Sequence, residues 1–157
     1  MKRRIVVALA GNPNSGKTTI FNALTGARQH VGNYPGVTVE RKEGFLRHGD
    51  TELQIVDLPG TYSLTAYSAE ELVAWNFIID EQPDVVVDIL DASNLERNLY
   101  LAVQLMELGV PLVLVFNMSD MARVQGYEFA VEKLSRFFGA RIVQTVGHKS
   151  TGMKELL

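Results

Sequence analysis

The chain has 157 residues, the length of one ordinary domain and enough to bury a hydrophobic core. Apolar residues make up 46% and charged residues 21%, which fits a soluble globular protein and excludes a disordered or collagen-like chain. The net charge of −3 gives no sign of a nucleic-acid partner, and the lack of cysteine excludes disulfides and thiolate metal sites. No apolar run approaches the roughly 18 residues of a membrane span.

Apolar strand patterns alternate with helical patterns along the chain. In chain order we expect a buried strand at 3–10, a helix at 17–26, a loop at 27–36, a hairpin at 37–57, a loop and helix at 58–80, a strand at 84–90, a helix at 95–109, a strand at 111–117, a helix at 129–139 and a strand at 140–146. Buried strands separated by helices indicate an α/β fold with a mostly parallel sheet and helices on both faces.

Residues 11–18, GNPNSGKT, match the phosphate-binding pattern G-x-x-x-x-G-K-[ST] between a predicted strand and a predicted helix. Glycines let the backbone wrap around phosphate oxygens, and the N–H groups at the helix start supply positive potential. Lys17 is expected to reach the β- and γ-phosphates, and the Thr18 hydroxyl to bind Mg²⁺. The residues assigned to the nucleotide in this loop are Gly11, Asn12, Pro13, Asn14, Ser15, Gly16, Lys17, Thr18 and Thr19.

Asp57 ends a predicted strand and begins the sequence Asp57-Leu58-Pro59-Gly60. Ligands of open α/β sheets bind at the carboxyl ends of the strands. We therefore expect Asp57 to hold a water of Mg²⁺ and the Gly60 N–H to meet the γ-phosphate, with Leu58 and Pro59 also at the nucleotide. Alone, Asp-x-x-Gly is a weak pattern, but its place after the phosphate loop and at a strand end makes it informative.

Two loops near the end of the chain are predicted to contact the base. Asp120, in FNMSD, can accept two hydrogen bonds from the N1–H and 2-amino groups of guanine, an arrangement that adenine does not offer. Asn117 is expected to tie this loop to the phosphate loop, and Met118 to cover the base face. Val146 and Gly147 lie in the last loop, where the Gly147 N–H is expected to meet the guanine O6.

With these motifs in place, the chain resembles the G domain of the FeoB family, bacterial ferrous-iron transporters with an N-terminal cytoplasmic GTPase domain. FeoB domains are among the TrmE-Era-FeoB-like, potassium-activated GTPases. The resemblance covers essentially the whole chain and rests on residues 11–26, 31–44, 57–71, 96–109 and 117–120. It implies a Ras-like P-loop GTPase fold, with a six-stranded mostly parallel sheet, one antiparallel edge strand, and helices on both faces.

The resemblance also assigns the two switch segments, switch I at 29–38 and switch II at 58–76. It implies that Thr38 closes on Mg²⁺ and the γ-phosphate, with Gly36 and Val37 beside it. Tyr34, also in switch I, either covers the nucleotide or is an ordinary loop aromatic. Thr18, Thr38 and Asp57 are the expected Mg²⁺ ligands.

The position after Gly60, where many GTPases carry a water-orienting glutamine, holds Thr61. By the resemblance, Asn14 would ligate a K⁺ that stabilises the charge of the reacting phosphate; the alternative is that Asn14 only braces the loop. The expected catalytic residues are Asn14, Lys17, Thr38 and Gly60, with backbone groups of switch I as further candidates for positioning water.

The predicted function is slow hydrolysis of GTP to GDP with Mg²⁺, stimulated by K⁺, in the regulatory G domain of a ferrous-iron transporter. We expect residues 1–157 to form one domain cut early in its last helix, TGMKELL. Its partners would be the family's helical and transmembrane domains, at the cytoplasmic face of the bacterial inner membrane, with oligomers formed through the membrane portion. The alternatives are a free-standing ribosome-assembly-type GTPase and a non-catalytic guanine-nucleotide-binding module.

Overall fold

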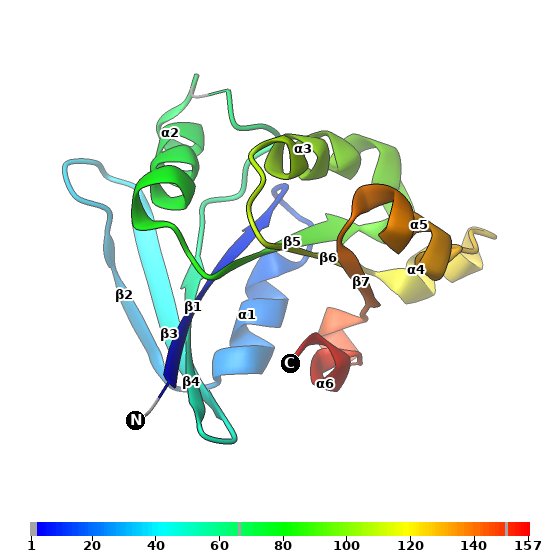
Figure 1. Cartoon of the computed structure of the whole chain (residues 1–157), viewed down its shortest axis with the longest axis horizontal. Helices are drawn as coiled ribbons and strands as arrows, with labels where there is room; N and C mark the ends of the chain where they lie inside the picture. Colours follow the sequence, from blue (N-terminus) through cyan, green and yellow to red (C-terminus); the bar gives the residue numbers. More distant parts are fainter. Residues whose placement is uncertain (1–2, 66, 150) are drawn as a thin grey trace.

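The computed structural model describes residues 3–65, 67–149 and 151–157. Within these ranges one seven-stranded sheet has the order β2-β3-β4-β1-β5-β6-β7 (Figure 1). The strands are β1 Arg3–Gly11, β2 Gln29–Asn33, β3 Glu40–His48, β4 Thr51–Asp57, β5 Val85–Asp91, β6 Leu112–Asn117 and β7 Arg141–Gln144. Strand β3 runs against both of its neighbours, and every adjacent pair without β3 is parallel. The predicted α/β class with a mostly parallel sheet is confirmed.

Helices cover both faces of this sheet, as Figure 1 shows. They are α1 Lys17–Thr25, α2 Ala69–Asn76 with a π-helical continuation Phe77–Glu81, α3 Leu95–Glu107, α4 Ser119–Val124, α5 Val131–Phe138 and α6 Met153–Leu156. Alternation along β1 supplies both cores: Val7 and Leu9 pack with α1, whereas Ala8 and Ala10 belong to the cluster of α2 and α3. This layering leaves the carboxyl ends of the parallel strands free to carry loops.

The sheet has one strand more than expected because part of the predicted loop 27–36 is strand β2. Residues Gln29–Asn33 pair antiparallel with Glu40–Gly44 of β3, which therefore lies inside the sheet and not at its edge. Four of the five β2 residues are exposed, so backbone pairing and not burial defines this strand. An exposed edge strand has no apolar alternation, which is why the sequence pattern did not reveal it.

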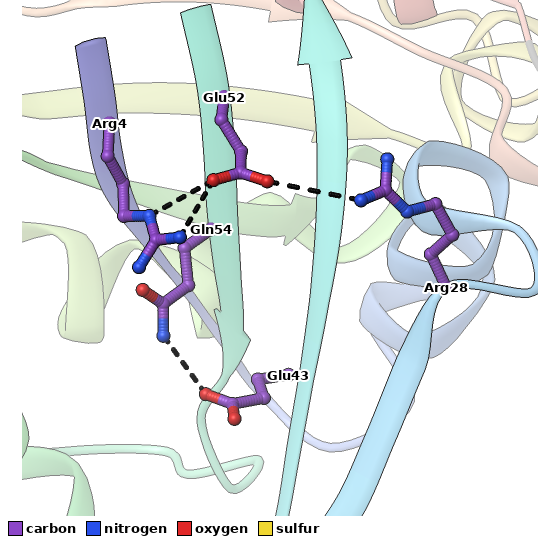
Figure 2. A network of polar contacts seen from close by, with 5 residues as sticks. All are labelled: Arg4, Arg28, Glu43, Glu52 and Gln54. Atoms are coloured by element: carbon purple, nitrogen blue, oxygen red, sulfur yellow. Dashed lines mark hydrogen bonds and ion pairs between the residues drawn. The ribbon is translucent and has the colours of Figure 1, made fainter. Parts of the chain in front are cut away.

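Charged side chains near the starts of β1 and β4 form a network on the sheet surface (Figure 2). Glu52 of β4 lies between Arg4 of β1, at 2.8 Å, and Arg28, at 3.9 Å. Gln54 donates a hydrogen bond of 3.1 Å to Glu43 of β3. Exposed pairs of this kind contribute at most about 1 kcal/mol each. Glu52 connects β1 to β4 near the starts of these strands, whereas the bond from Gln54 connects β4 to β3 closer to Asp57.

One carboxyl group, that of Asp88, is buried in the middle of the sheet. Asp88 lies on β5, is 1% exposed, and neither of its oxygens has a hydrogen-bond partner among the described residues. Val86 and Leu90, the neighbours on the same face of the strand, belong to apolar clusters. Burial raises the pKa of Asp88 well above its ordinary value, so the folded chain favours the protonated form.

Replacing Asp88 with asparagine should change how stability depends on pH. Above the ordinary aspartate pKa, near 4, the unfolded chain releases a proton that folded Asp88 retains. The free energy of unfolding of the wild type therefore falls as pH rises from about 4 to the raised pKa, by about 1.4 kcal/mol per pH unit. Asp88→Asn lacks this component, whereas Asp80→Asn, at an exposed position, is the control. Urea unfolding from about pH 4 to 8 measures it, and parallel curves for wild type and Asp88→Asn would contradict it.

Candidate functional site

The phosphate loop joins β1 to α1 and has a backbone that few residues can adopt. Asn14 and Gly16 have positive φ angles of 67° and 88°. Asparagine tolerates this left-handed region better than most residues, and glycine enters it freely. A Cβ on Gly16 would also collide with the side-chain nitrogen of Asn117. The loop therefore needs glycine at this position for both its conformation and its packing.

A cavity of about 380 Å³ opens over this loop, and Gly60 of the predicted Asp57–Gly60 segment also lines it. Its lining residues are Asn12, Pro13, Asn14, Gly16, Lys17, Thr18 and Gly60. The Thr61 N–H donates a 3.0 Å hydrogen bond to the Gly11 carbonyl, so the start of switch II is fixed against the phosphate loop. Thr61 itself is buried at 4% exposure and does not line the cavity. Thr19, predicted to touch the nucleotide, lies exposed on α1 and lines no part of this cavity.

Lys17 and Asp57 form a buried ion pair at the edge of this cavity. Both residues are at most 9% exposed, and the Lys17 ammonium also donates to the Leu58 carbonyl at 2.6 Å. Burial raises the pKa of Asp57, and the charge of Lys17 opposes that rise. The Asp57 carboxylate therefore sits in a site that favours a cation against it. Pro59, the next predicted residue, lines a second, smaller cavity on this side together with Leu58.

That second cavity, of about 160 Å³, contains two residues that the motifs did not predict. Glu40 and Lys42 of β3 line it together with Lys17, Asp57, Leu58 and Pro59. The antiparallel register of the hairpin places Lys42 directly opposite Asp57. The sequence predicted this hairpin at residues 37–57 as two strands joined by a turn. Its register, which brings Lys42 to Asp57, was the missing information.

Switch I does not meet the rest of the site in this structure. Thr38 is exposed and lines neither cavity, so the described residues do not assemble it with Thr18 and Asp57. Tyr34 neither covers the phosphate loop nor lies free in solvent, because it is 7% exposed within the α2 and α3 cluster. Burial raises its pKa to about 12. The role of Thr38 stays a prediction that requires movement of its loop.

The loop around Thr38 is held at both ends. The Tyr34 N–H donates to the Val39 carbonyl at 2.9 Å, and the Arg41 guanidinium lies 5.6 Å from the Tyr34 ring centre and 5.9 Å from that of Phe77. Val37 lines a groove of about 380 Å³ beside α2. Gly36, with a φ of 76°, lies in the turn between Tyr34 and Val39. Gly36 and Val37 thus lie away from the phosphate loop cavity here.

Asn117, at the end of β6, connects three loops through its side chain. Its Nδ2 donates to the Ser15 carbonyl at 3.0 Å, and its Oδ1 accepts from the Thr145 hydroxyl and the Gly147 N–H, both at 2.9 Å. The predicted tie between the base loop and the phosphate loop is present. The Gly147 N–H, however, is bonded to Asn117 and is not a free donor for a base oxygen.

Asp120 offers an acceptor that no described residue uses. Its Oδ1 is buried without a hydrogen-bond partner among the described residues, while its Oδ2 lies 3.9 Å from the Lys149 ammonium. Met118 caps the N-terminus of α4 with a positive φ of 56°. Val146 is fixed by a pair of backbone hydrogen bonds to Thr151, at 3.1 and 3.2 Å. An unpartnered carboxylate oxygen in the first turn of α4 is suited to accept hydrogen bonds from a bound ligand.

Comparison with known proteins agrees with these motifs. The family model described as Ferrous iron transport protein B matches residues 5–157, which is nearly the whole chain. The chain belongs to the FeoB family. Solved FeoB structures share its fold: the G domain from Methanococcus jannaschii has a TM-score of 0.87 and 47% identity, over 98% of this chain and 93% of that one. The resemblance inferred from the motifs is confirmed.

Among curated relatives, a Porphyromonas gingivalis protein named as a fusion of Fe(2+) transport protein A and Fe(2+) transporter FeoB is 53% identical over 153 residues, covering 97% of this chain and 18% of that protein. A GDP-bound point mutant of S. thermophilus NFeoB has a TM-score of 0.89 and 47% identity, over 96% of this chain and 59% of that one. The chain thus spans about a fifth of the length of the curated FeoB relatives it matches. In the part that the structure describes, no helix is both long and apolar enough to cross a membrane.

Replacing Asn117 with alanine should destabilise the fold. The change leaves the Ser15 carbonyl, the Thr145 hydroxyl and the Gly147 N–H without their partner in a buried place. The expected loss in the free energy of unfolding is about 2–4 kcal/mol, measured by urea unfolding. Asn76→Ala, at an exposed position of α2, should change it by less than about 0.5 kcal/mol. Equal effects of the two substitutions would contradict the role of Asn117.

Proposed function

We propose that this chain binds GTP with Mg²⁺ and slowly hydrolyses it to GDP, as the G domain of a ferrous-iron transporter. The observation that carries the proposal is the side chain of Asn117, which joins the phosphate loop to a loop where Asp120 presents an unpartnered acceptor. The Asn117 side chain would thereby hold the phosphate-binding loop and the base-recognising carboxylate of Asp120 in a fixed relative position. The GDP-bound S. thermophilus relative supports the choice of a guanine nucleotide.

Asp120 would supply the base specificity. A carboxylate only accepts hydrogen bonds, and guanine presents two adjacent donors, its N1–H and 2-amino group. Adenine presents no such pair, so its binding would leave a buried charged acceptor without donors, which is costly. Met118 would then cover one face of the base with its apolar side chain.

An Asp120→Asn variant should change its base preference from guanine to xanthine. The amide can donate to the 2-oxo group of xanthine, whereas it faces the 2-amino group of guanine with one acceptor fewer. We expect GDP affinity to fall by about a hundredfold or more and xanthosine diphosphate to bind better than GDP. Competition binding of GDP, ADP and xanthosine diphosphate to wild type and variant measures this. Unchanged GDP affinity in Asp120→Asn would remove Asp120 from the base site.

The phosphate groups would be held by Lys17 and by the backbone N–H groups at the start of α1. Lys17 now pairs with Asp57, so binding a phosphate requires its ammonium to leave or share that carboxylate. Its new partner would also be anionic and in a site of low exposure, so the exchange replaces one charge-assisted hydrogen bond by another.

The residues around Asp57 fit a magnesium ion. The Asp57 carboxylate already has a cation against it, and the Thr18 hydroxyl lines the neighbouring cavity, to which Lys17 also belongs. Carboxylate and hydroxyl oxygens are ligands that Mg²⁺ accepts in nucleotide sites. Bound there, Mg²⁺ would neutralise charge on the β- and γ-phosphates. Thr38 would complete the set only after its loop moves.

Hydrolysis in this site would depend on Asn14 and on the backbone. Thr61 is buried with its N–H bonded to Gly11, so it does not stand in for a water-orienting glutamine. The side chain of Asn14 is exposed, and it makes no hydrogen bond to the described residues that would support a bracing role alone. It is therefore available as a ligand for K⁺, which would offset phosphate charge as an arginine finger does in other GTPases.

Turnover of GTP should be faster in KCl than in NaCl at equal ionic strength, and Asn14→Ala should lose this difference. The reason is that only the potassium-dependent part of the charge stabilisation involves Asn14. Single-turnover phosphate release in both salts measures it, with Asn22→Ala, at an exposed position of α1, as the control.

The outcomes separate three readings of the site. Equal rates in both salts, or an Asn14→Ala variant that keeps its K⁺ response, would contradict the role of K⁺ but not the GTPase. GTP binding without hydrolysis in either salt would indicate a non-catalytic guanine-nucleotide-binding module.

The wider setting follows from the FeoB family. We propose that the chain works at the cytoplasmic face of the bacterial inner membrane, joined to helical and transmembrane domains that lie beyond residues 1–157. Oligomers would form through the membrane portion. Family membership favours this setting over a free-standing GTPase of the ribosome-assembly type.

A further inference from the structure

Glu40 and Lys42 of β3 lie beside Asp57 but belong to none of the nucleotide motifs. Lys42 is directly opposite Asp57 in the antiparallel pairing of β3 with β4. Side chains at opposed positions project from the same face, with their Cβ atoms about 4.5–5.5 Å apart. Glu40, two residues earlier on the strand, projects from that face as well. All three side chains line the cavity of about 160 Å³ that Lys17 also borders.

The charges in this cavity are divided into two pairs. Lys17 is paired with Asp57, and the Lys42 ammonium lies 3.4 Å from a Glu40 carboxylate oxygen. The Lys42 and Glu40 side chains are 35% and 56% exposed, whereas the Asp57 side chain is 7% exposed. Lys42 and Glu40 can therefore rearrange in contact with water. Leaving the buried Asp57 carboxylate without a cation would cost much more free energy.

Phosphate binding disturbs this division, because phosphate and Asp57 both attract Lys17. Once Lys17 turns to the phosphates, Asp57 needs a different positive partner. Mg²⁺ is one, as the proposed function requires. Lys42 is the alternative to Mg²⁺, because it lies on β3 opposite Asp57 and lines the same cavity.

We propose that Lys42 competes with Mg²⁺ for Asp57 and that Glu40, by holding Lys42, limits this competition. The two residues would together set the Mg²⁺ concentration at which the bound nucleotide becomes tightly held. This inference rests on the proposed binding of a magnesium–nucleotide complex. Lys42 and Glu40 are positioning residues in it, since they act on Asp57 and not on the nucleotide.

Removing either charge should shift the magnesium requirement in a defined direction. Mg²⁺ is expected to slow GDP release, and the midpoint is the Mg²⁺ concentration at which half of this effect is reached. Lys42→Met removes the competing cation, so the midpoint should fall by about three- to tenfold. Glu40→Gln frees Lys42 and removes a negative charge, so the same midpoint should rise by a similar factor. The double variant should stay below the wild-type midpoint and close to that of Lys42→Met, because Glu40 has no Lys42 left to hold. Lys42→Arg, which keeps the charge, should stay close to the wild-type midpoint.

The experiment is release of a fluorescent GDP analogue at increasing Mg²⁺ and constant ionic strength, which needs no hydrolysis. Glu132→Gln and Lys133→Met, at exposed positions of α5, make the same charge changes away from the site and should leave the midpoint unchanged. Thermal unfolding of each variant checks that it is folded. If Lys42→Met does not fold, Glu40→Gln and Lys42→Arg still decide the matter.

The inference is overturned if Lys42→Met shifts the midpoint no more than Lys133→Met, or shifts it to higher Mg²⁺. A midpoint in Glu40→Gln equal to that of the wild type overturns it as well. If GDP release from the wild type does not respond to Mg²⁺ at all, then the proposed magnesium site itself is wrong. That result is distinct from a normal magnesium response that ignores Lys42 and Glu40.

Discussion

Three hydrogen bonds to the side chain of Asn117 hold the candidate site together. They join the loop after β1, the end of β6 and the loop after β7, which are far apart along the chain. Because the amide is 2% exposed, water cannot replace these bonds without opening the site. In the proposed function, recognition of the phosphates and of the base would consequently depend on the same side chain.

The charged residues of the site follow a second constraint, which is the small exposure of Asp57. A buried carboxylate is tolerated only with a cation or a proton, and Lys17 meets that need in this structure. In the proposed function the same lysine turns to the phosphates of the nucleotide. Nucleotide binding would therefore exchange the partner of Asp57. In our proposal, Glu40 and Lys42 on β3 would adjust how readily Mg²⁺ becomes the new partner of Asp57.

Local sequence determined the phosphate loop, the Asp57 corner and the FNMSD loop, because glycine, lysine and carboxylate at fixed spacing act within a few residues. Long-range pairing decided what the sequence did not reveal. The edge strand β2 depends on hydrogen bonds to β3, and the meeting of Lys42 with Asp57 depends on hairpin register. The burial of Tyr34 depends on α2, which lies much later in the chain. Short α4 has too few turns to show a periodic pattern.

The anchored position of Tyr34 limits how far switch I can travel. Between this buried ring and the start of β3 at Glu40 the chain has five residues, 35–39. A residue spans at most about 3.6 Å, so Thr38, two residues before Glu40, stays within about 7 Å of that strand end while β3 is intact. The proposed approach of Thr38 to Asp57 would then be a short swing about a fixed hinge. A longer sweep would pull an aromatic ring out of the core, at a cost of about 1.5–3 kcal/mol, and would loosen α2 at the same time.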